Sequence, residues 1–235
     1  LIEQTWILYG ANEQTGSLVI FDRFSWKLPN ANSVVLATSG AGKSFAVKLE
    51  ILRYLLLGIP VIVVDPENEY KWLCEKVGWT YVNIAMNSQQ YINPFDLPPK
   101  LEDAEYGKWD LLRSQIANLI WLVSTLIWWL NAQEEALMDK ALQSTYALKE
   151  ITLEDEDYTG KKPPIMEDLI NVLEWMDGWS DIAIKLSKFS SGTFGKLFNN
   201  QTNVDLGNQL TVFSIRDIED SLRNSAMYNV LNYIW

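Results

Sequence analysis

Histidine is absent from this chain of 235 residues, and cysteine occurs once, as Cys74. Without histidine the chain has no His-based general acid or base, no Ser–His–Asp triad and no zinc site that uses imidazole. A single cysteine excludes an internal disulfide and fits a reducing compartment. Because Cys74 lies among apolar residues, we expect a small buried side chain rather than a nucleophile. These two shortages exclude a large part of catalytic chemistry.

Positive charge is also scarce, with 19 Lys and Arg against 30 Asp and Glu and a net charge of −11. This balance argues against broad electrostatic binding of the chain to nucleic acid. Lys185, Lys188 and Lys196 flank residues 189–194. They indicate either a local basic strip or the solvated end of a helix and its loop.

Long hydrophobic runs are few. Residues 1–11 lack the basic start and apolar stretch of a signal peptide, so we expect none there. The longest apolar run, residues 116–130, is interrupted by Asn118, Ser124 and Thr125. As a helix it spans roughly 22 Å, short of a hydrocarbon core of about 30 Å. It predicts a buried helix or, alternatively, an apolar face that meets a membrane or a partner subunit.

The chain does contain a glycine-rich loop that ends in a lysine and a serine. An apolar stretch leads into Thr-Ser-Gly-Ala-Gly-Lys-Ser, in which Gly40 and Gly42 precede Lys43 and Ser44. The segment fits the pattern G-x-x-x-x-G-K-[ST], except that Ala37 stands at the first glycine position. In such loops the backbone N–H groups and the N-terminus of the following helix together bind polyphosphate.

We therefore expect a nucleotide phosphate site in this loop, with an accidental glycine-rich loop as the alternative. Lys43 would reach the β- and γ-phosphates, and the Ser44 hydroxyl would bind Mg²⁺. The expected cofactor-binding residues are Thr38, Ser39, Gly40, Ala41, Gly42, Lys43, Ser44 and Phe45.

Strand and helix patterns alternate around this loop. Short apolar runs predict strands over residues 18–21, 33–37, 61–65 and 81–85, and helical patterns predict helices over residues 43–57 and 67–77. The order from residue 33 onward describes two successive βαβ units, whose right-handed crossovers produce a parallel sheet. The predicted fold class is α/β.

The character of the sequence changes after residue 96. Helical patterns cover 108–149, with a break near residues 130 and 131, and then 166–176 and 181–189. A strand over 210–215 and a helix over 217–235 follow. We therefore predict three parts: residues 1–96 begin the core, residues 97–190 form an all-α insertion, and residues 191–235 return to the core.

Hydrolysis needs carboxylates as well as a phosphate loop, one to hold Mg²⁺ and one to position water. Asp65 ends the predicted strand 61–65, at the edge of a parallel sheet where ligands bind. If residues 67–77 are helical, Glu69 faces the same side as Asp65. Alternatively, Asp65 caps this helix and Glu69 supports its N-terminal dipole. The expected catalytic residues are Lys43, Asp65 and Glu69.

Three segments in this order resemble the large ATPases of conjugation and type IV secretion machines, in the FtsK/HerA-like branch of RecA-type P-loop ATPases. They are residues 37–45, the Asp-Pro-Glu-Asn-Glu-Tyr segment 65–70, and Ile-Asn-Pro-Phe at 92–95. The resemblance covers nearly the whole chain. It implies a RecA-like P-loop core with a parallel sheet and an all-α insertion.

The resemblance also implies ATP and Mg²⁺, with Lys43 and Ser44 as phosphate and metal ligands and Asp65 and Glu69 as an acidic pair. It implies a cytoplasmic motor, hexameric when it works, at the inner face of the cell membrane. Its partners would be the other subunits of a secretion or conjugation complex. Its substrate would be DNA or protein.

The chain departs from this family at its end. In such ATPases the main Mg²⁺-supporting Asp-Glu pair ends a later strand, and this sequence stops before that strand and before any arginine finger. We therefore expect a C-terminally truncated chain that binds nucleotide with weak or no turnover.

Two other functions remain open at this point. A P-loop kinase for a small molecule would use the helical insertion as a lid. Such lids carry several arginines, whereas residues 100–190 contain only Arg113. A nucleotide-binding assembly module without turnover would use the nucleotide only to stabilise contacts between subunits.

Overall fold

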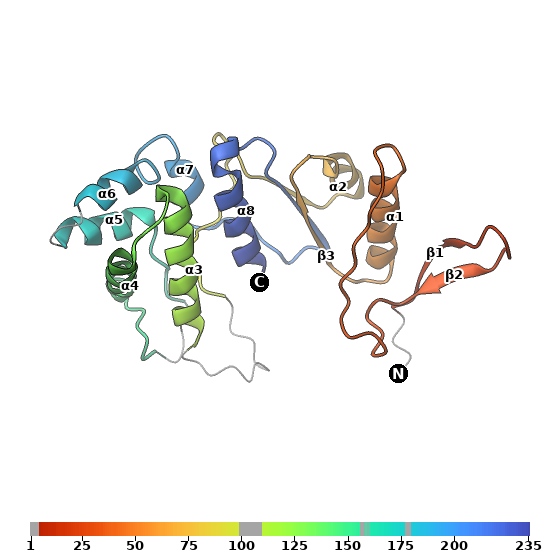
Figure 1. Cartoon of the computed structure of the whole chain (residues 1–235), viewed down its shortest axis with the longest axis horizontal. Helices are drawn as coiled ribbons and strands as arrows, with labels where there is room; N and C mark the ends of the chain where they lie inside the picture. Colours follow the sequence, from red (N-terminus) through yellow and green to blue (C-terminus); the bar gives the residue numbers. More distant parts are fainter. Residues whose placement is uncertain (1–4, 99–109, 156–157, 159, 177–179) are drawn as a thin grey trace. The chain divides into compact units, whose positions relative to one another are not determined.

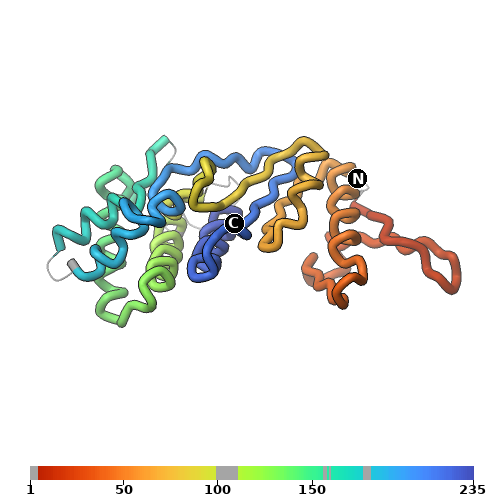
Figure 2. The backbone as a smooth tube through the Cα atoms, turned by 90° about the horizontal axis from the view of Figure 1, so that it is seen from above, coloured from red at the N-terminus to blue at the C-terminus, as the bar shows by residue number. Residues whose placement is uncertain are grey.

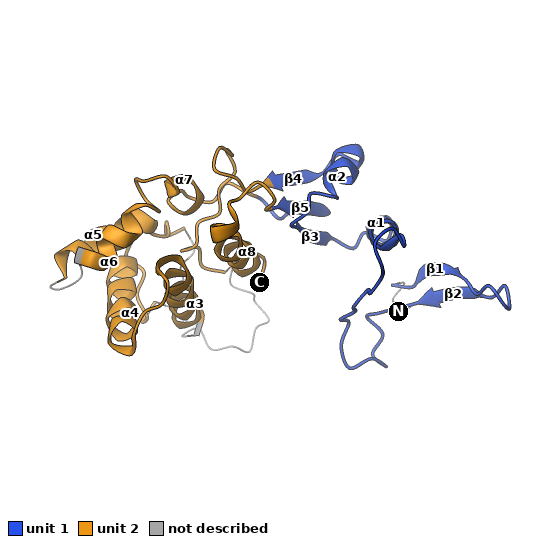
Figure 3. Ribbon diagram, turned by 45° about the horizontal axis from the view of Figure 1, so that its top comes forward, with its two compact units in different colours: residues 1–82, 205–214 blue, residues 83–204, 215–235 orange. Residues whose placement is uncertain are grey.

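The computed structural model describes residues 5–98, 110–155, 158, 160–176 and 180–235 (Figure 1). Its contacts divide the chain into two compact units (Figure 3). Unit 1 comprises residues 1–82 and 205–214, and unit 2 comprises residues 83–204 and 215–235. The predicted three-part division of the sequence, with boundaries after residues 96 and 190, stays a prediction.

A three-stranded sheet forms the centre of unit 1, in the order β3-β5-β4. β3 (Val61–Asp65) and β5 (Leu210–Ser214) are parallel, and their register runs from Val61 opposite Leu210 to Asp65 opposite Ser214. β4 (Thr80–Asn83) pairs with the other side of β5. Residues 61–65 predicted a buried parallel strand because they are continuously apolar up to Asp65, and residues 210–215 were predicted as a further strand. Both predictions are confirmed, and so is the α/β class.

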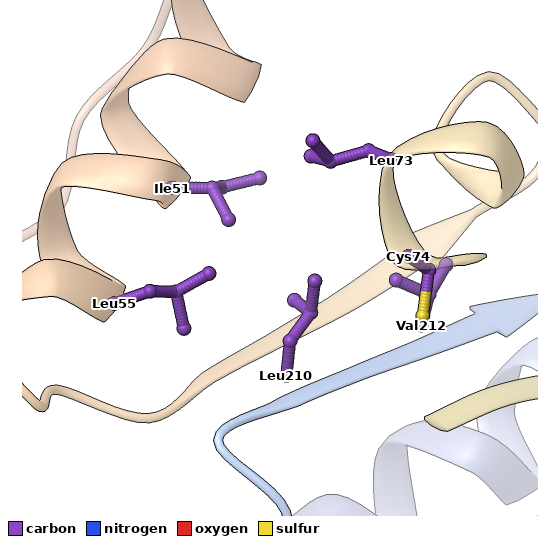
Figure 4. Close-up of a cluster of buried hydrophobic side chains, with 6 residues drawn as sticks. All are labelled: Ile51, Leu55, Leu73, Cys74, Leu210 and Val212. Carbon is purple, nitrogen blue, oxygen red and sulfur yellow. The ribbon is translucent and has the colours of Figure 1, made fainter. Parts of the chain in front are cut away.

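Helices α1 (Lys43–Leu56) and α2 (Lys71–Val77) pack against this sheet. Figure 4 shows the buried side chains where they meet: Ile51 and Leu55 of α1, Leu73 and Cys74 of α2, and Leu210 and Val212 of β5. Cys74 has no exposed surface, and burial raises the pKa of its thiol. The expectation of a small buried cysteine is confirmed.

A two-stranded antiparallel hairpin, β1 (Ile7–Ala11) and β2 (Leu18–Phe21), precedes the glycine-rich loop. Side chains from the hairpin region bind α1: the Tyr9 hydroxyl donates to a Glu50 carboxylate oxygen at 2.7 Å, and Arg23 forms an ion pair with the same carboxylate. Burial and the neighbouring Glu50 raise the pKa of Tyr9. The strand at 18–21 was predicted, but its partner β1 was not.

Two sequence-based predictions in unit 1 are wrong. Residues 33–37 form no strand, and Val34 and Leu36 are 82% and 89% exposed. A strand needs a neighbour for its backbone hydrogen bonds, and among the described residues none pairs with this segment. The second helix begins at Lys71 instead of residue 67, because Asn68 has a left-handed φ of 59° and the chain makes a turn there.

Unit 2 is helical within its described residues. Its helices are α3 (Asp110–Ile127), α4 (Ala132–Ala147), α5 (Met166–Trp175), α6 (Ser180–Ser187), the short α7 (Gly195–Phe198) and α8 (Asp220–Ile234). α3 packs on α4, α6 and α8, and α5 packs on α4 and α6 (Figures 1 and 2). The predicted break near residue 131 is confirmed, since Asn131 caps α4. The predicted start at residue 108 lies outside the described residues.

The apolar run 116–130 forms most of α3 and the turn that follows it, and most of its large side chains are buried in unit 2. The buried ones are Ile116, Leu119, Leu122, Val123, Leu126, Ile127 and Leu130. This confirms the buried helix. In the part of the chain that the structure describes, no helix has the length and apolar character that crossing a membrane requires.

The segment Ile92–Phe95, which contributed to the family resemblance, lies in the interior of unit 2. The Asn93 side-chain amide donates to the Pro164 carbonyl at 2.9 Å, and the Tyr146 hydroxyl donates to the Phe95 carbonyl at 2.8 Å. Gln115 of α3 and Asn229 of α8 donate to the Pro94 and Ile92 carbonyls. Buried backbone carbonyls need such partners. This segment therefore joins α3, α4 and α8, which is a structural role.

Neighbouring residues in α1 provide a test of the unit 1 core. Leu55 is 7% exposed, whereas Leu56 is 86% exposed. We expect Leu55→Ala to lower the free energy of unfolding by about 2–5 kcal/mol, because it removes buried methyl groups and leaves a cavity. Leu56→Ala should change it by less than about 0.5 kcal/mol, as exposed positions usually do. Urea unfolding of both variants measures this, and equal losses would contradict the packing described.

Candidate nucleotide-binding site

The glycine-rich loop turns directly into helix α1. Gly40 and Gly42 have φ angles of 78° and 87°, in the left-handed region that favours glycine. The Ala41 N–H donates to the Thr38 carbonyl at 3.2 Å, which closes a turn. Gly42 is the N-cap of α1, and its carbonyl accepts the first helical hydrogen bond, from Ala46, at 2.9 Å. The N-terminal N–H groups of α1 therefore have no partner within the helix and are available to an anion.

An open pocket of about 510 Å³ lies at this loop. It is lined by Ala37, Thr38, Ser39, Gly40, Gly42, Lys43, Ser44, Phe45 and Glu69. Seven of the eight expected cofactor-binding residues line the pocket, and Ala41 does not. The lining combines three hydroxyl groups, one ammonium group and one carboxylate, a set suited to a phosphorylated ligand with a divalent cation.

Glu69 reaches the pocket from a turn rather than from a helix. The Tyr70 N–H donates to an Asp65 carboxylate oxygen at 2.8 Å, and the Tyr81 hydroxyl donates to the Asn68 side chain at 2.7 Å. Lys48 of α1 lies over the Tyr70 ring, 5.2 Å from its centre. Burial, with Glu69 and Asp65 nearby, raises the pKa of Tyr70. These contacts fix the turn from both sides and so fix the backbone that carries Glu69.

Asp65 lies at the carboxyl end of β3 and is only 2% exposed. It is not among the residues that line the pocket, and its carboxylate supports the turn through Tyr70. This arrangement resembles the alternative interpretation from the sequence, in which Asp65 caps the segment that follows it. Because aligned residues of parallel strands point to the same face, Asp65 shares the sheet face that α1 and α2 cover.

Ser214 is a residue that sequence reasoning missed. It is opposite Asp65 in the β3–β5 register, it is fully buried, and its hydroxyl has no hydrogen-bond partner among the described residues. A buried hydroxyl without a partner is uncommon and costs free energy. The only sequence signal was its place at the end of the strand 210–215, level with Asp65.

The residues present provide some of the groups that Mg²⁺ and a nucleoside triphosphate need. Ser44 and Glu69 line the same pocket and offer the oxygen ligands that Mg²⁺ prefers. Among the described residues, no cluster of three acidic or cysteine side chains is available to hold a metal ion alone. Mg²⁺ at this site would therefore depend on phosphate oxygens and water for most of its ligands, as it usually does at such sites.

Comparison with known proteins decides the family. Residues 30–232 match the family described as helicase HerA, central domain. The chain belongs to this family. This confirms the HerA-like branch that the three sequence segments predicted.

Two relatives of this HerA-family chain are considerably longer. Protein TraC of Escherichia coli (strain K12) is 24% identical over 215 residues, which are 87% of this chain and 23% of TraC. The structure of VirB4 of Thermoanaerobacter pseudethanolicus matches with a TM-score of 0.83 and 27% identity, over 97% of this chain and 62% of that one. The chain thus spans less than two thirds of either relative, and the VirB4 likeness confirms the predicted fold.

The left-handed conformation of Gly42 predicts how a substitution by alanine changes the stability of the chain. Gly42→Ala should lower the free energy of unfolding by about 1–2 kcal/mol, because alanine disfavours positive φ. A clash is not the cause, since a Cβ at Gly42 meets no atom within 4 Å. Gly10→Ala is the matched control: its surroundings are equally open and its φ is not in the left-handed region. Equal stability losses in urea unfolding would contradict this account.

Proposed function

We propose that the loop of residues 38–45 binds the phosphates of ATP with Mg²⁺, and that the chain is part of an ATPase motor of conjugation or type IV secretion. One observation carries the proposal. The two left-handed glycines shape a loop at the start of α1, and Lys43, Ser44 and Glu69 line a single pocket there.

Each group has a separate task in this proposal. The backbone N–H groups at the start of α1 donate to phosphate oxygens, and the positive end of the helix dipole favours their charge. The Lys43 ammonium group contacts the β- and γ-phosphates. The Ser44 hydroxyl is a ligand of Mg²⁺, which, when bound, neutralises charge that develops on the phosphates. Phe45 lines the same pocket and contributes its backbone N–H.

The structure supports a direct role at the nucleotide for Glu69 better than for Asp65. Glu69 lines the pocket, so we assign it contact with Mg²⁺-bound water. Asp65 is buried beneath the turn, so its contribution here is to position Glu69 and Tyr70. The sequence-based proposal of Asp65 as a catalytic residue therefore has less support than that of Glu69.

The likeness to TraC and VirB4 supports the assignment of the chain to a motor. Because the chain spans only part of each, the transported substrate, whether DNA or protein, belongs to the proposal. So do a hexameric assembly, a peripheral location at the inner face of the cell membrane, and contacts with other subunits of the complex. The kinase alternative finds no support in either relative. The assembly module without turnover differs from the motor only in hydrolysis.

Calorimetry of ATP binding, with and without Mg²⁺, tests the phosphate site. Lys43→Ala should weaken binding roughly ten- to a hundredfold, because it removes a charge-assisted contact worth on the order of 1.5–3 kcal/mol. Lys27→Ala is the control, since Lys27 is a lysine of the same unit that stacks on Trp26 outside the pocket.

Equal affinities for the parent chain, Lys43→Ala and Lys27→Ala would refute the phosphate site. Hydrolysis is measured separately on the same proteins. We expect weak turnover or none from these 235 residues. Robust steady-state hydrolysis that disappears in Lys43→Ala would show that the weak-turnover part of the proposal is wrong, while leaving the phosphate site intact.

A further inference from the structure

Two adjacent tryptophans at the end of α3 take no part in the nucleotide site. Trp128 and Trp129 are 80% and 78% exposed, although the residues on either side of them, Ile127 and Leu130, are buried. They belong to unit 2, whose helices α3 and α4 pack together and are joined by this connection (Figure 3). An exposed pair of large aromatic side chains of this kind is the composition expected at the centre of a binding surface.

The backbone at the pair is strained. Trp128 and Trp129 have φ angles of 66° and 80°, which non-glycine residues rarely adopt. The Trp129 N–H donates to the Ser124 carbonyl at 2.8 Å, the closing hydrogen bond of a helix C-terminus at which glycine is usual. Strained residues persist at sites where the conformation serves a function. Here the unusual backbone holds two indoles in solvent.

The connection that carries the pair is anchored on both sides. Before it, the Ser124–Trp129 hydrogen bond closes α3. After it, Leu130 is buried, and the Asn131 side chain accepts from the N–H groups of Gln133 and Glu134 while Glu134 accepts from the Asn131 N–H. A surface fixed in this way loses little conformational entropy when a partner binds.

The charge around the pair selects the kind of partner. Unit 2 contains 21 Asp and Glu and 12 Lys and Arg, a net charge of −9. Glu134 and Glu135 lie in the first turn of α4, the helix that follows the pair, and the last turn of α3 has no basic residue. The C-terminus of α3 adds partial negative charge. This potential repels an anionic membrane surface and attracts cations, which indole faces also bind.

We infer that Trp128 and Trp129 form a docking site for a segment of a partner protein in which lysine or arginine stands among apolar residues. The apolar side chains of that segment would cover the indoles. Its cationic side chains would pair with Glu135 and stack on the exposed aromatic faces. This inference does not depend on the proposed nucleotide function, since the pair lies in the other unit.

The test uses the full chain and a synthetic amphipathic peptide of leucine and lysine, together with a peptide in which glutamate replaces each lysine. We expect the lysine peptide to bind, and the Trp128→Gly/Trp129→Gly variant to bind it at least tenfold more weakly. Trp175→Ala is the matched control, because Trp175 is 90% exposed on α5 of the same unit. It should leave the affinity unchanged.

Stability distinguishes docking from a structural role. Because glycine adopts positive φ without strain, the double glycine variant should unfold at the same temperature as the parent chain or higher. A clear fall in its Tm would overturn the inference by showing that the indoles support the fold. Equal peptide affinity in the parent chain and the double variant would overturn it too. Binding of phosphatidylcholine vesicles through the same two tryptophans would replace the protein partner by a membrane.

Discussion

The proposed nucleotide site depends on the packing that holds helix α1 in place. The glycine-rich loop leads directly into this helix, so the direction of α1 sets the direction of the N–H groups at its start. Ile51 and Leu55 pack one side of α1 against α2 and β5. Glu50 accepts a hydrogen bond from Tyr9 and forms an ion pair with Arg23, both from the hairpin region. Most anchoring of a helix comes from such packing rather than from its own propensity. The buried core of unit 1 therefore determines the position of the exposed loop.

Glu69 is placed by the same core through a different route. Asp65 ends the parallel strand β3, and its carboxylate receives the N–H of Tyr70 at the entrance of α2. Asn68 takes the left-handed conformation that the turn requires and accepts from Tyr81 of β4. The Asp-Pro-Glu-Asn-Glu-Tyr segment thus combines a buried carboxylate that shapes the turn with an exposed one that faces the pocket. Ile92–Phe95 serves a different purpose, because its polar contacts join the helices of unit 2.

Much of the fold was predictable because it follows hydrophobic patterning. Residues 61–64 are a continuous apolar run, residues 210–215 are mostly apolar, and α1 follows a glycine-rich turn. The failures occurred where a neighbour decides the structure. Residues 33–37 look like a strand, yet no described strand pairs with them, and β1 exists only because β2 pairs with it.

The candidate site was predictable in part for the same reason. The loop residues 38–45 carry a local pattern, so seven of the eight proved to line one pocket. Glu69 was expected on a helix and reached the pocket from a turn, because a left-handed Asn68 is not visible in a helical pattern. Ser214 was missed altogether, since only the β3–β5 register places it beside Asp65.

Amide hydrogen exchange of the full chain, with and without ATP and Mg²⁺, tests the central claim most directly. If the N–H groups at the start of α1 hold phosphate, exchange at residues 40–45 should slow on addition of nucleotide, and exchange in the buried strand β5 should change little. Unchanged exchange at residues 40–45, at a nucleotide concentration that saturates binding, would show that the nucleotide sits elsewhere and would contradict the account.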